Sequence, residues 1–220
     1  MRQDRAWVRL SPSGRPLNLL NPDPKAWDDA DLAVGLSRTY RWGGHSAWEL
    51  PLSVAQHSLT VLAIRRAEPG QPLTEAEQLR ELLHDADEGL LSFDCITPVK
   101  PHLGEGYHRL VERLQAAITA RYRLPAWTAE EYASHKSADR LAAASEALHV
   151  VGWSAQDIRS TLEIETTPLS QDPLAAPRGM RPWQPWPPQL AAKRFLQELN
   201  RLTASIHFQS TPIAQEAAYA

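Results

Sequence analysis

Residues 74–91, TEAEQLRELLHDADEGLL, combine the strongest helix signal in the chain with a histidine–aspartate pair. Thr74 stands three residues before Glu77, the spacing of a capping box, which predicts that a helix begins after Thr74. An apolar stripe at helical spacing follows, formed by Leu79, Leu82, Leu83, Ala86 and Leu90. The stripe predicts one continuous helix, on which His84 and Asp85 are neighbours.

Similar patterns recur along the chain. Apolar spacing and start signals predict further helices over residues 30–40, 52–67, 105–123, 128–149, 154–163 and 188–203. Pro51 is expected to open the second of these at its first turn. Before them, residues 5–22 alternate weakly around Ser13-Gly14, which predicts a hairpin-like pair of short strands. The fold class expected from these patterns is all-α, a compact helical bundle with a short hairpin at its N-terminal end.

The remaining segments carry proline or lack periodicity. Residues 92–104 contain two prolines and are expected to form a loop. Residues 168–188 are rich in proline and tryptophan, which predicts an extended connector that packs onto the bundle before the last helix. The tail, residues 205–220, is expected to be disordered. Residues 1–204 are therefore expected to form a single domain.

Composition excludes several classes of protein. The chain has 220 residues, 43% of them hydrophobic and 22% charged, which is ordinary globular usage and excludes wholesale disorder. Lys and Arg total 23 against 26 Asp and Glu, a net charge of −3, whereas a binder of duplex nucleic acid should show a basic surplus. No apolar run approaches the roughly 18 residues of a membrane span, and the N-terminus lacks the apolar core of a signal peptide. With a single cysteine, the chain is expected to be cytoplasmic.

Four side chains in separate segments form a candidate metal site. They are His57 in VAQHSL, His84 and Asp85 in ELLHDADE, and Asp139 in KSADRL. Two imidazoles and two carboxylates suit Mn, Co, Ni, Fe or Zn, and such an ion can turn a water molecule into a nucleophile near neutral pH. Taken one at a time, His57 is better explained as a core histidine, His84 as a solvated surface residue and Asp139 as a surface partner of Lys136. Only the ordered set indicates a metal.

The ordered set, a histidine, then His-Asp, then a distant aspartate, resembles the HD-domain metal-dependent phosphohydrolase superfamily. DCITPVK, residues 94–100, resembles the loop after the HD helix in bacterial HD-domain 5′-deoxynucleotidases, and Arg41-Trp42 resembles their nucleotide-contacting pair. The strings RWGGHS, PLSVAQHS, NLLNPDP and PWPP look more like the phage-type branch, which includes dATP triphosphohydrolases. The resemblance covers about residues 10–203 and implies an all-α HD domain.

The resemblance also implies roles in catalysis. His57, His84, Asp85 and Asp139 would hold one divalent transition metal per chain, Co, Mn, Ni, Zn or Fe, with Mg also possible. Asp85 would thereby take part in catalysis. Glu88, one turn after His84, would position or deprotonate the attacking water, or protonate the leaving oxygen.

Substrate contacts carried over in the same way are Arg41, Trp42, His45, Asp94, Pro98 and Lys100. Arg41 and Lys100 would meet phosphate, which guanidinium and ammonium groups bind well, and His45 is a second phosphate contact. Trp42 would lie against the sugar or base, and Asp94 would accept a hydrogen bond from a sugar hydroxyl. The alternatives are a core aromatic at Trp42, a turn residue at Pro98 and a solvated lysine at Lys100.

The expected function is hydrolysis at the 5′-phosphate end of a deoxynucleotide by a metal-activated water. The product is either phosphate from a monophosphate or triphosphate from a deoxynucleoside triphosphate. One alternative is a di-iron HD oxygenase, for which His102 and His108 would supply additional ligands. Another is a non-catalytic nucleotide-binding HD protein that docks a partner through residues 168–188. The resemblance implies a homo-oligomer with a nucleotide as small-molecule partner. The charge balance and the lack of a long apolar run predict that neither duplex nucleic acid nor a membrane is a partner.

Overall fold

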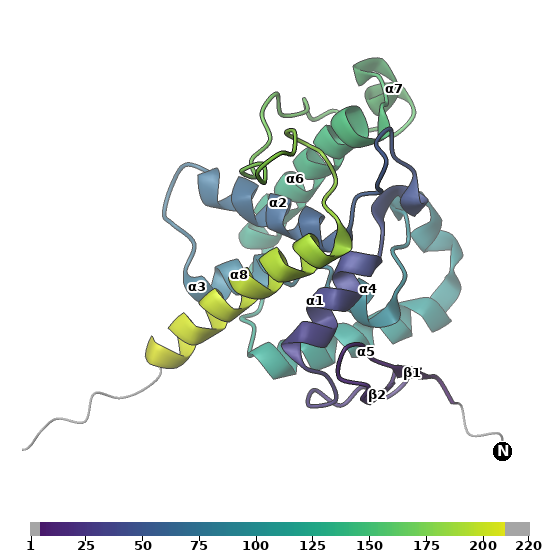
Figure 1. The fold of residues 1–220 in the computed structure, drawn as a ribbon, viewed down its shortest axis with the longest axis vertical. Helices are drawn as coiled ribbons and strands as arrows, with labels where there is room; N and C mark the ends of the chain where they lie inside the picture. The colour runs from purple at the N-terminus through teal and green to yellow at the C-terminus, as the bar shows by residue number, and fades with distance from the viewer. Residues whose placement is uncertain (1–4, 210–220) are drawn as a thin grey trace, which may run out of the picture.

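The computed structural model describes residues 5–209, which fold into a helical bundle with a small hairpin at one end (Figure 1). The elements are β1 Trp7–Arg9, β2 Pro16–Asn18, α1 Asp29–Arg38, η1 Arg41–Gly44, α2 Val54–Ala67, α3 Glu75–Leu82, α4 Ala86–Leu91, η2 Thr97–His102, α5 Gly104–Tyr122, α6 Ala129–Glu146, η3 Ala147–Val151, α7 Ala155–Ser160 and α8 Pro188–Gln209. β1 and β2 pair antiparallel, with Val8 opposite Leu17. The all-α class and the N-terminal hairpin predicted from the sequence are confirmed.

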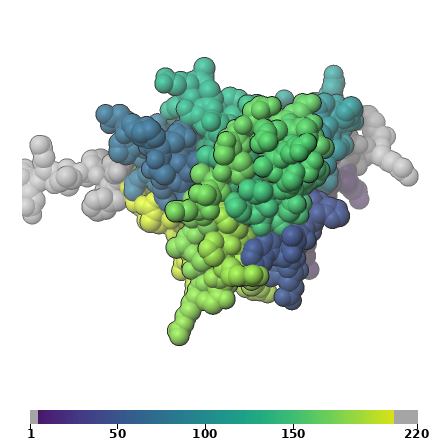
Figure 2. Space-filling model, turned by 90° about the horizontal axis from the view of Figure 1, so that it is seen from above, coloured from purple at the N-terminus to yellow at the C-terminus, as the bar shows by residue number. Residues whose placement is uncertain are grey.

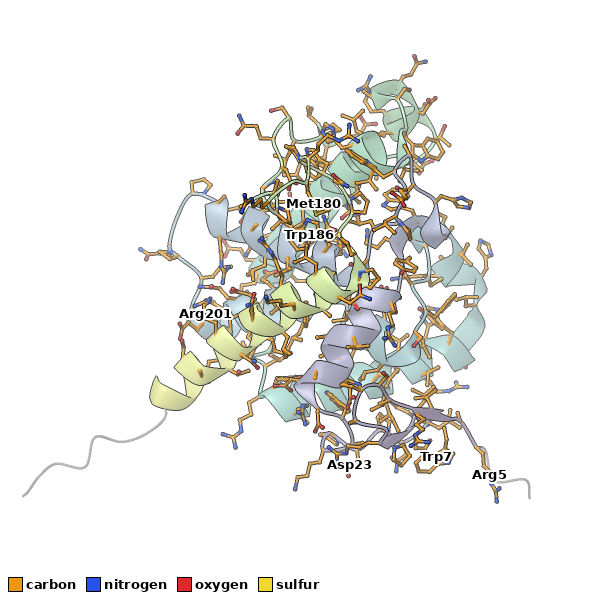
Figure 3. All side chains as sticks on the ribbon, in the orientation of Figure 1. Arg5, Trp7, Asp23, Met180, Trp186 and Arg201 are labelled. Atoms are coloured by element: carbon orange, nitrogen blue, oxygen red, sulfur yellow. The ribbon has the colours of Figure 1, made fainter. Side chains whose placement is uncertain are left out.

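The main core lies where α8 crosses α1, α2 and α3 (Figure 1). Phe195 and Leu199, one turn apart on α8, are fully buried, as are Leu32 and Leu36 on α1. The connector before α8 also packs on this core, because Trp186, labelled in Figure 3, is buried in it. The Arg194 guanidinium lies 5.0 Å from the centre of the Trp186 ring. Packing of the connector through a tryptophan, expected from the sequence, is confirmed.

A second, smaller apolar cluster joins α6 to α2. Ala138 and Ala142, one turn apart on α6, pack against Val61 and Ile64 of α2. Alanine side chains let two helices approach closely, because they add little bulk at the crossing. The contact fixes the face of α6 that carries Asp139 beside α2, so it positions the candidate site.

α1 and α4 cross with their backbones in contact. A Cβ atom on Gly35 would lie 2.2 Å from the carbonyl oxygen of Gly89, and one on Gly89 would lie 2.6 Å from Cγ of Leu36. Neither position has room for a side chain. Because Glu88 directly precedes Gly89, this crossing also sets where the Glu88 side chain begins.

Gly35→Ala should lower the free energy of unfolding by about 1–3 kcal/mol, because the added methyl group forces α1 and α4 apart. Urea unfolding followed by circular dichroism measures this. Gly106→Ala is the matched control, because Gly106 lies in α5 with nothing near its Cβ position. The control should gain about 0.5–1 kcal/mol from helix propensity. Equal stability of Gly35→Ala and the wild type would contradict this account of the crossing.

Residues 74–91 do not form the single continuous helix that was predicted for them. α3 ends at Leu82 and α4 begins at Ala86, so His84 and Asp85 lie in a turn between two helices. The Glu81 carbonyl accepts a hydrogen bond from Nδ1 of His84 at 2.8 Å, a side-chain bond that competes with the helical pattern. The residues of the apolar stripe are buried on both sides of the turn, so apolar spacing alone does not reveal the break.

Three other boundaries also differ from the sequence prediction. The segment 92–104 is not wholly a loop, because it contains the short 3₁₀ helix η2. Pro51 does not open α2, whose N-cap is Ser53, with its hydroxyl accepting from the Gln56 amide. α8 runs on to Gln209, so the disorder predicted from residue 205 is wrong up to that point; residues 210–220 lie outside the described part of the chain.

Seen from above, the surface is formed mainly by residues of about 140–185, with the 41–50 segment beside them (Figure 2).

Large apolar side chains are exposed along the segment after α4, at Phe93, Ile96, Val99 and Leu103. Within residues 5–209, every helix is too short or too polar to cross a membrane.

Candidate metal centre

The four predicted metal ligands come together from three separate parts of the fold. His57 comes from α2, His84 and Asp85 from the turn between α3 and α4, and Asp139 from α6. Nε2 of His57 lies 3.3 Å from Nε2 of His84 and 3.4 Å from Oδ1 of Asp139. Oδ2 of Asp85 lies 3.5 Å from Nε2 of His57 and 3.1 Å from Nε2 of His84. The ligand atoms of His57, His84 and Asp139 all lie within 4.8 Å of one another, and Oδ2 of Asp85 contacts both imidazoles beside them.

These separations match the coordination sphere of one transition-metal ion. Ligand atoms about 2.1 Å from a cation lie about 3.0 Å apart at right angles and about 3.4 Å apart at the tetrahedral angle. The four observed distances, 3.1, 3.3, 3.4 and 3.5 Å, all exceed the right-angle value and lie close to the tetrahedral value. A mixed nitrogen and oxygen set suits Mn, Co, Ni, Fe or Zn better than Ca. By geometry and chemistry, the residues fit a divalent transition metal.

Both imidazoles are held so that Nε2 faces the cluster. Nδ1 of His57 lies 2.6 Å from Oε1 of Glu146, and Nδ1 of His84 lies 2.8 Å from the Glu81 carbonyl oxygen. A hydrogen bond donated by Nδ1 leaves Nε2 unprotonated in the neutral ring, as a metal ligand requires. The orientation of each ring is therefore set before any cation binds.

The two ligand carboxylates are held in the ionised form. Burial opposes ionisation, but His57, His84 and Lys136 keep the pKa of Asp139 well below its usual range. Oδ2 of Asp139 accepts from Lys136 at 2.5 Å, which leaves Oδ1 to face His57. The pKa of Asp85 is likewise lowered, against burial, mainly by His84. Both carboxylates are thus charged at neutral pH, as ligands must be.

Glu88 is a buried carboxyl group beside the cluster. Its Oε2 has no hydrogen-bond partner among the described residues, and Oε1 lies 3.7 Å from Nζ of Lys100. Burial, with Asp85 and Asp94 nearby, raises the pKa of Glu88 to about 10. A carboxyl group that keeps its proton at neutral pH can act as a general acid.

Arg41 and Trp42 approach the cluster from the turn η1. Nη1 of Arg41 lies 3.8 Å from Oδ2 of Asp85, and Nε donates to Oε2 of Glu146 at 2.9 Å. Trp42 and Gly43 both have positive φ, of 59° and 62°, so the turn holds a tryptophan in the left-handed region. Such a conformation costs about 1–2 kcal/mol and persists only where other contacts fix it.

The other predicted substrate contacts are placed unequally. Lys100 reaches Glu88, and Asp94 is close enough to Arg41 for their charges to interact. Pro98 is exposed on η2. His45 is exposed after η1, and its side chain hydrogen-bonds to none of the described residues. The structure therefore brings Lys100 and Asp94 towards the cluster but not His45.

His102 and His108, the additional ligands that a di-iron site would need, lie on the surface. Both are exposed, on η2 and α5, and His108 contacts the ring of Tyr107. Among the described residues, the group that could hold a metal comprises His57, His84 and Asp139, with Asp85 beside them, and neither exposed histidine joins it. The structure therefore offers one cation site here and no second set of histidine ligands among residues 5–209.

Two buried carboxylates next to the ligand histidines were missed by the sequence reasoning. Glu146 binds His57, and Glu81 binds Nδ1 of His135, whose ring packs edge-on against His84 with centroids 4.9 Å apart. Glu146 follows Asp139 by seven residues, two helical turns, and so lies on the same face of α6. That spacing was the available signal for Glu146.

Cation affinity should rise with pH. Burial and Arg41 lower the pKa of His57, but Glu146 and Asp139 outweigh them and raise it to about 9. Below pH 9 a proton therefore occupies His57 in the metal-free protein, and a cation must displace it. We expect the dissociation constant for Co²⁺ to fall about tenfold per pH unit between pH 6.5 and 8.5. Calorimetry in buffers of different ionisation enthalpy counts the released proton; pH-independent affinity without proton release would contradict the expectation.

Comparison with known proteins identifies a family but not an activity. No protein-family model matches the chain. An uncharacterized protein from Rhodobacter capsulatus is 43% identical to it over 152 residues, which are 68% of this chain and 76% of the relative. Identity at this level over most of both sequences shows common descent. The chain therefore belongs to the same family as this uncharacterized Rhodobacter capsulatus protein.

Proposed function

We propose that the chain is a metal-dependent phosphohydrolase of the HD-domain superfamily that acts on the 5′-phosphate end of deoxynucleotides. The observation that carries the proposal is the convergence of His57, His84 and Asp139, whose ligand atoms lie within 4.8 Å of one another, with Oδ2 of Asp85 3.1 Å and 3.5 Å from the two imidazoles. The sequence order of these residues, which resembles that superfamily, supports it further. The proposal places the protein in the cytoplasm as a homo-oligomer with one cation per chain.

The surroundings of the cluster suit a phosphoryl group. Arg41 offers a guanidinium fork beside Asp85, and Lys100 an ammonium group beside Glu88. Both groups bind phosphate oxygens well. A divalent cation held by the four ligands would lower the pKa of a water molecule and offset phosphoryl charge. The positive charges of Arg41 and Lys100 beside the cluster favour a phosphate ester or anhydride over an uncharged substrate.

Glu88 is proposed as the general acid. Its buried carboxyl group keeps a proton at neutral pH and would donate it to the sugar oxygen that leaves the phosphorus atom. Nζ of Lys100 lies 3.7 Å from Oε1 of Glu88. Lys100 would bind the phosphate or stabilise the Glu88 carboxylate that forms when the proton is donated. Asp94 would accept a hydrogen bond from a sugar hydroxyl, and Trp42 would present its flat ring to the sugar or base.

Two reactions remain open within this proposal. A monophosphatase would release phosphate, whereas a triphosphohydrolase would release triphosphate and needs cations for the β and γ groups. Lys136 and Arg41 are each already opposite a carboxylate, Asp139 and Glu146 respectively. A triphosphate would therefore require further cations, such as the exposed Arg38.

The test uses metal-washed protein reloaded separately with Mn, Co, Ni, Zn or Mg. Each form is incubated with deoxy- and ribonucleoside mono- and triphosphates, and ion-exchange chromatography separates phosphate, pyrophosphate and triphosphate. Release of phosphate from monophosphates, or of triphosphate from triphosphates, only after reloading is the expected result. Metal binding without turnover of any nucleotide would contradict the proposal and favour a non-catalytic nucleotide-binding protein.

A further inference from the structure

Glu146 is a buried carboxylate that bonds to both sides of the candidate site. Only 2% of its side chain is exposed, at the last residue of α6. Oε1 accepts from Nδ1 of His57 at 2.6 Å. Oε2 accepts from Nε of Arg41 at 2.9 Å and from Nε1 of Trp42 at 3.2 Å. One oxygen thus serves a metal ligand, and the other serves the pair proposed to meet phosphate and sugar.

The bond to His57 determines which ring nitrogen can bind a cation. Glu146 accepts the Nδ1 proton, so the neutral ring carries its lone pair on Nε2. Nε2 is the atom 3.4 Å from Asp139 and 3.5 Å from Asp85. A carboxylate behind a ligand histidine also raises its basicity and fixes its plane.

The two hydrogen bonds that Oε2 accepts help to hold the η1 turn in place. They fix the indole of Trp42, which lies in the left-handed region, and the Nε edge of the Arg41 guanidinium. Nη1 of Arg41 remains directed towards Asp85, at 3.8 Å. Glu146 therefore helps to position the η1 turn relative to the cation ligands, together with the Arg41 amide, which donates to the Leu52 carbonyl at 2.9 Å.

The chain after η1 is bound to the same end of α6. The Ala47 amide donates to the Val150 carbonyl at 2.8 Å, and the Trp48 indole donates to the His149 carbonyl at 2.9 Å. Both acceptors lie in η3, a π-helical turn that directly follows Glu146. π turns inside helices are frequent at functional sites. These bonds hold the segment at the end of α6, while Glu146 and the Arg41–Asp85 ion pair join η1 to the candidate metal ligands.

We propose that Glu146 is a positioning residue that orients His57 for the cation and, through its second oxygen, holds Arg41 and Trp42 for the substrate phosphate and sugar. The substrate half of this inference rests on the proposed function; the cation half does not.

Glu146→Gln separates this role from a merely structural one. Three N–H donors converge on the two oxygens of Glu146, whereas glutamine offers one oxygen and one NH₂ group. Arg41 and Trp42 together claim the oxygen, so the NH₂ group faces Nδ1 of His57. His57 must then accept at Nδ1 and carry its proton on Nε2, the tautomer that does not bind a cation.

The experiment is a Co²⁺ titration of the full chain, followed by the visible absorption bands of the bound ion. The dissociation constant for Co²⁺ should be about 10- to 100-fold larger in Glu146→Gln than in the wild type.

Trp42→Phe removes only one of the two donors to Oε2 of Glu146. It should therefore leave the Co²⁺ affinity unchanged and raise the KM for the nucleotide that is hydrolysed. Asp31→Asn is the control for loss of a buried carboxylate, because Asp31 bonds Ser13 and the Asp28 amide at the other end of the fold. The control should lower the thermal midpoint without changing the Co²⁺ constant.

Wild-type Co²⁺ affinity in Glu146→Gln, with a thermal midpoint lowered as in Asp31→Asn, would overturn the inference. The Co²⁺ titration needs no nucleotide. It therefore tests the role of Glu146 in cation binding even if the protein hydrolyses no nucleotide. In that case the proposed function fails, while a weaker Co²⁺ constant in Glu146→Gln still supports the positioning of His57.

Discussion

Asp85→Asn should abolish both cation binding and nucleotide hydrolysis. The substitution keeps the shape of the side chain but removes the charge from Oδ2, the oxygen that lies within 3.5 Å of both ligand imidazoles. Without the cation, the pKa of water returns from about 7 towards 15.7, so we expect turnover to fall by more than about 1,000-fold. Metal analysis after desalting and steady-state kinetics with the best nucleotide measure the two effects.

Asp87→Asn is the control for this substitution. Asp87 is also buried, two residues further on, and burial together with Asp85 raises its pKa to about 6. Its Oδ1 accepts a hydrogen bond from Gln115 on α5, and Asp87 is not part of the group that could hold a metal. The control should retain one cation per chain and near-wild-type turnover. Loss of metal from both variants alike would show a general weakening of the fold, and full turnover of Asp85→Asn would contradict the assigned ligand set.

Glu88→Gln should separate catalysis from cation binding. Glutamine cannot donate an acidic proton, so kcat should fall by about 100- to 10,000-fold, while the Co²⁺ constant stays at its wild-type value. Because the pKa of Glu88 is raised to about 10, the fold disfavours its ionised form at neutral pH. A neutral glutamine therefore removes no stabilising charge, and the thermal midpoint should not fall.

The pH profile adds a second readout at Glu88. An acid must be protonated to act, so wild-type activity should decline on the alkaline side as Glu88 loses its proton. The residual activity of Glu88→Gln should lack that decline. A variant with wild-type kcat, or with the same alkaline decline, would assign the proton transfer to another group.

Local signals in the sequence predicted most helices because their start and stop residues act over a few positions. The Thr74–Glu77 capping box, for example, is present at the start of α3. The break at His84–Asp85 was not predictable from the apolar stripe, since Leu79 and Leu90, on either side of the turn, are both buried. The crossing of α1 and α4 at Gly35 and Gly89 was also hidden, because a close approach depends on which helices meet.

The candidate ligands could be named from residue type and order, because histidine and aspartate side chains are themselves groups that bind divalent transition metals. Glu146 was not, because a glutamate near the end of an alanine-rich helix is usually solvated. It becomes distinctive only when α6 packs on α2 and brings it to His57. The histidines and aspartates can therefore be picked out from the sequence, whereas the role of Glu146 becomes visible only in the folded structure.

The most direct test of the central claim is a Co²⁺ titration of metal-washed wild-type protein with turnover of a deoxynucleotide measured at each step. We predict that turnover rises from background in proportion to bound Co²⁺ and stops rising at one equivalent per chain. Turnover that is already complete in the metal-washed protein, or that stays at background with one equivalent bound, would contradict the account.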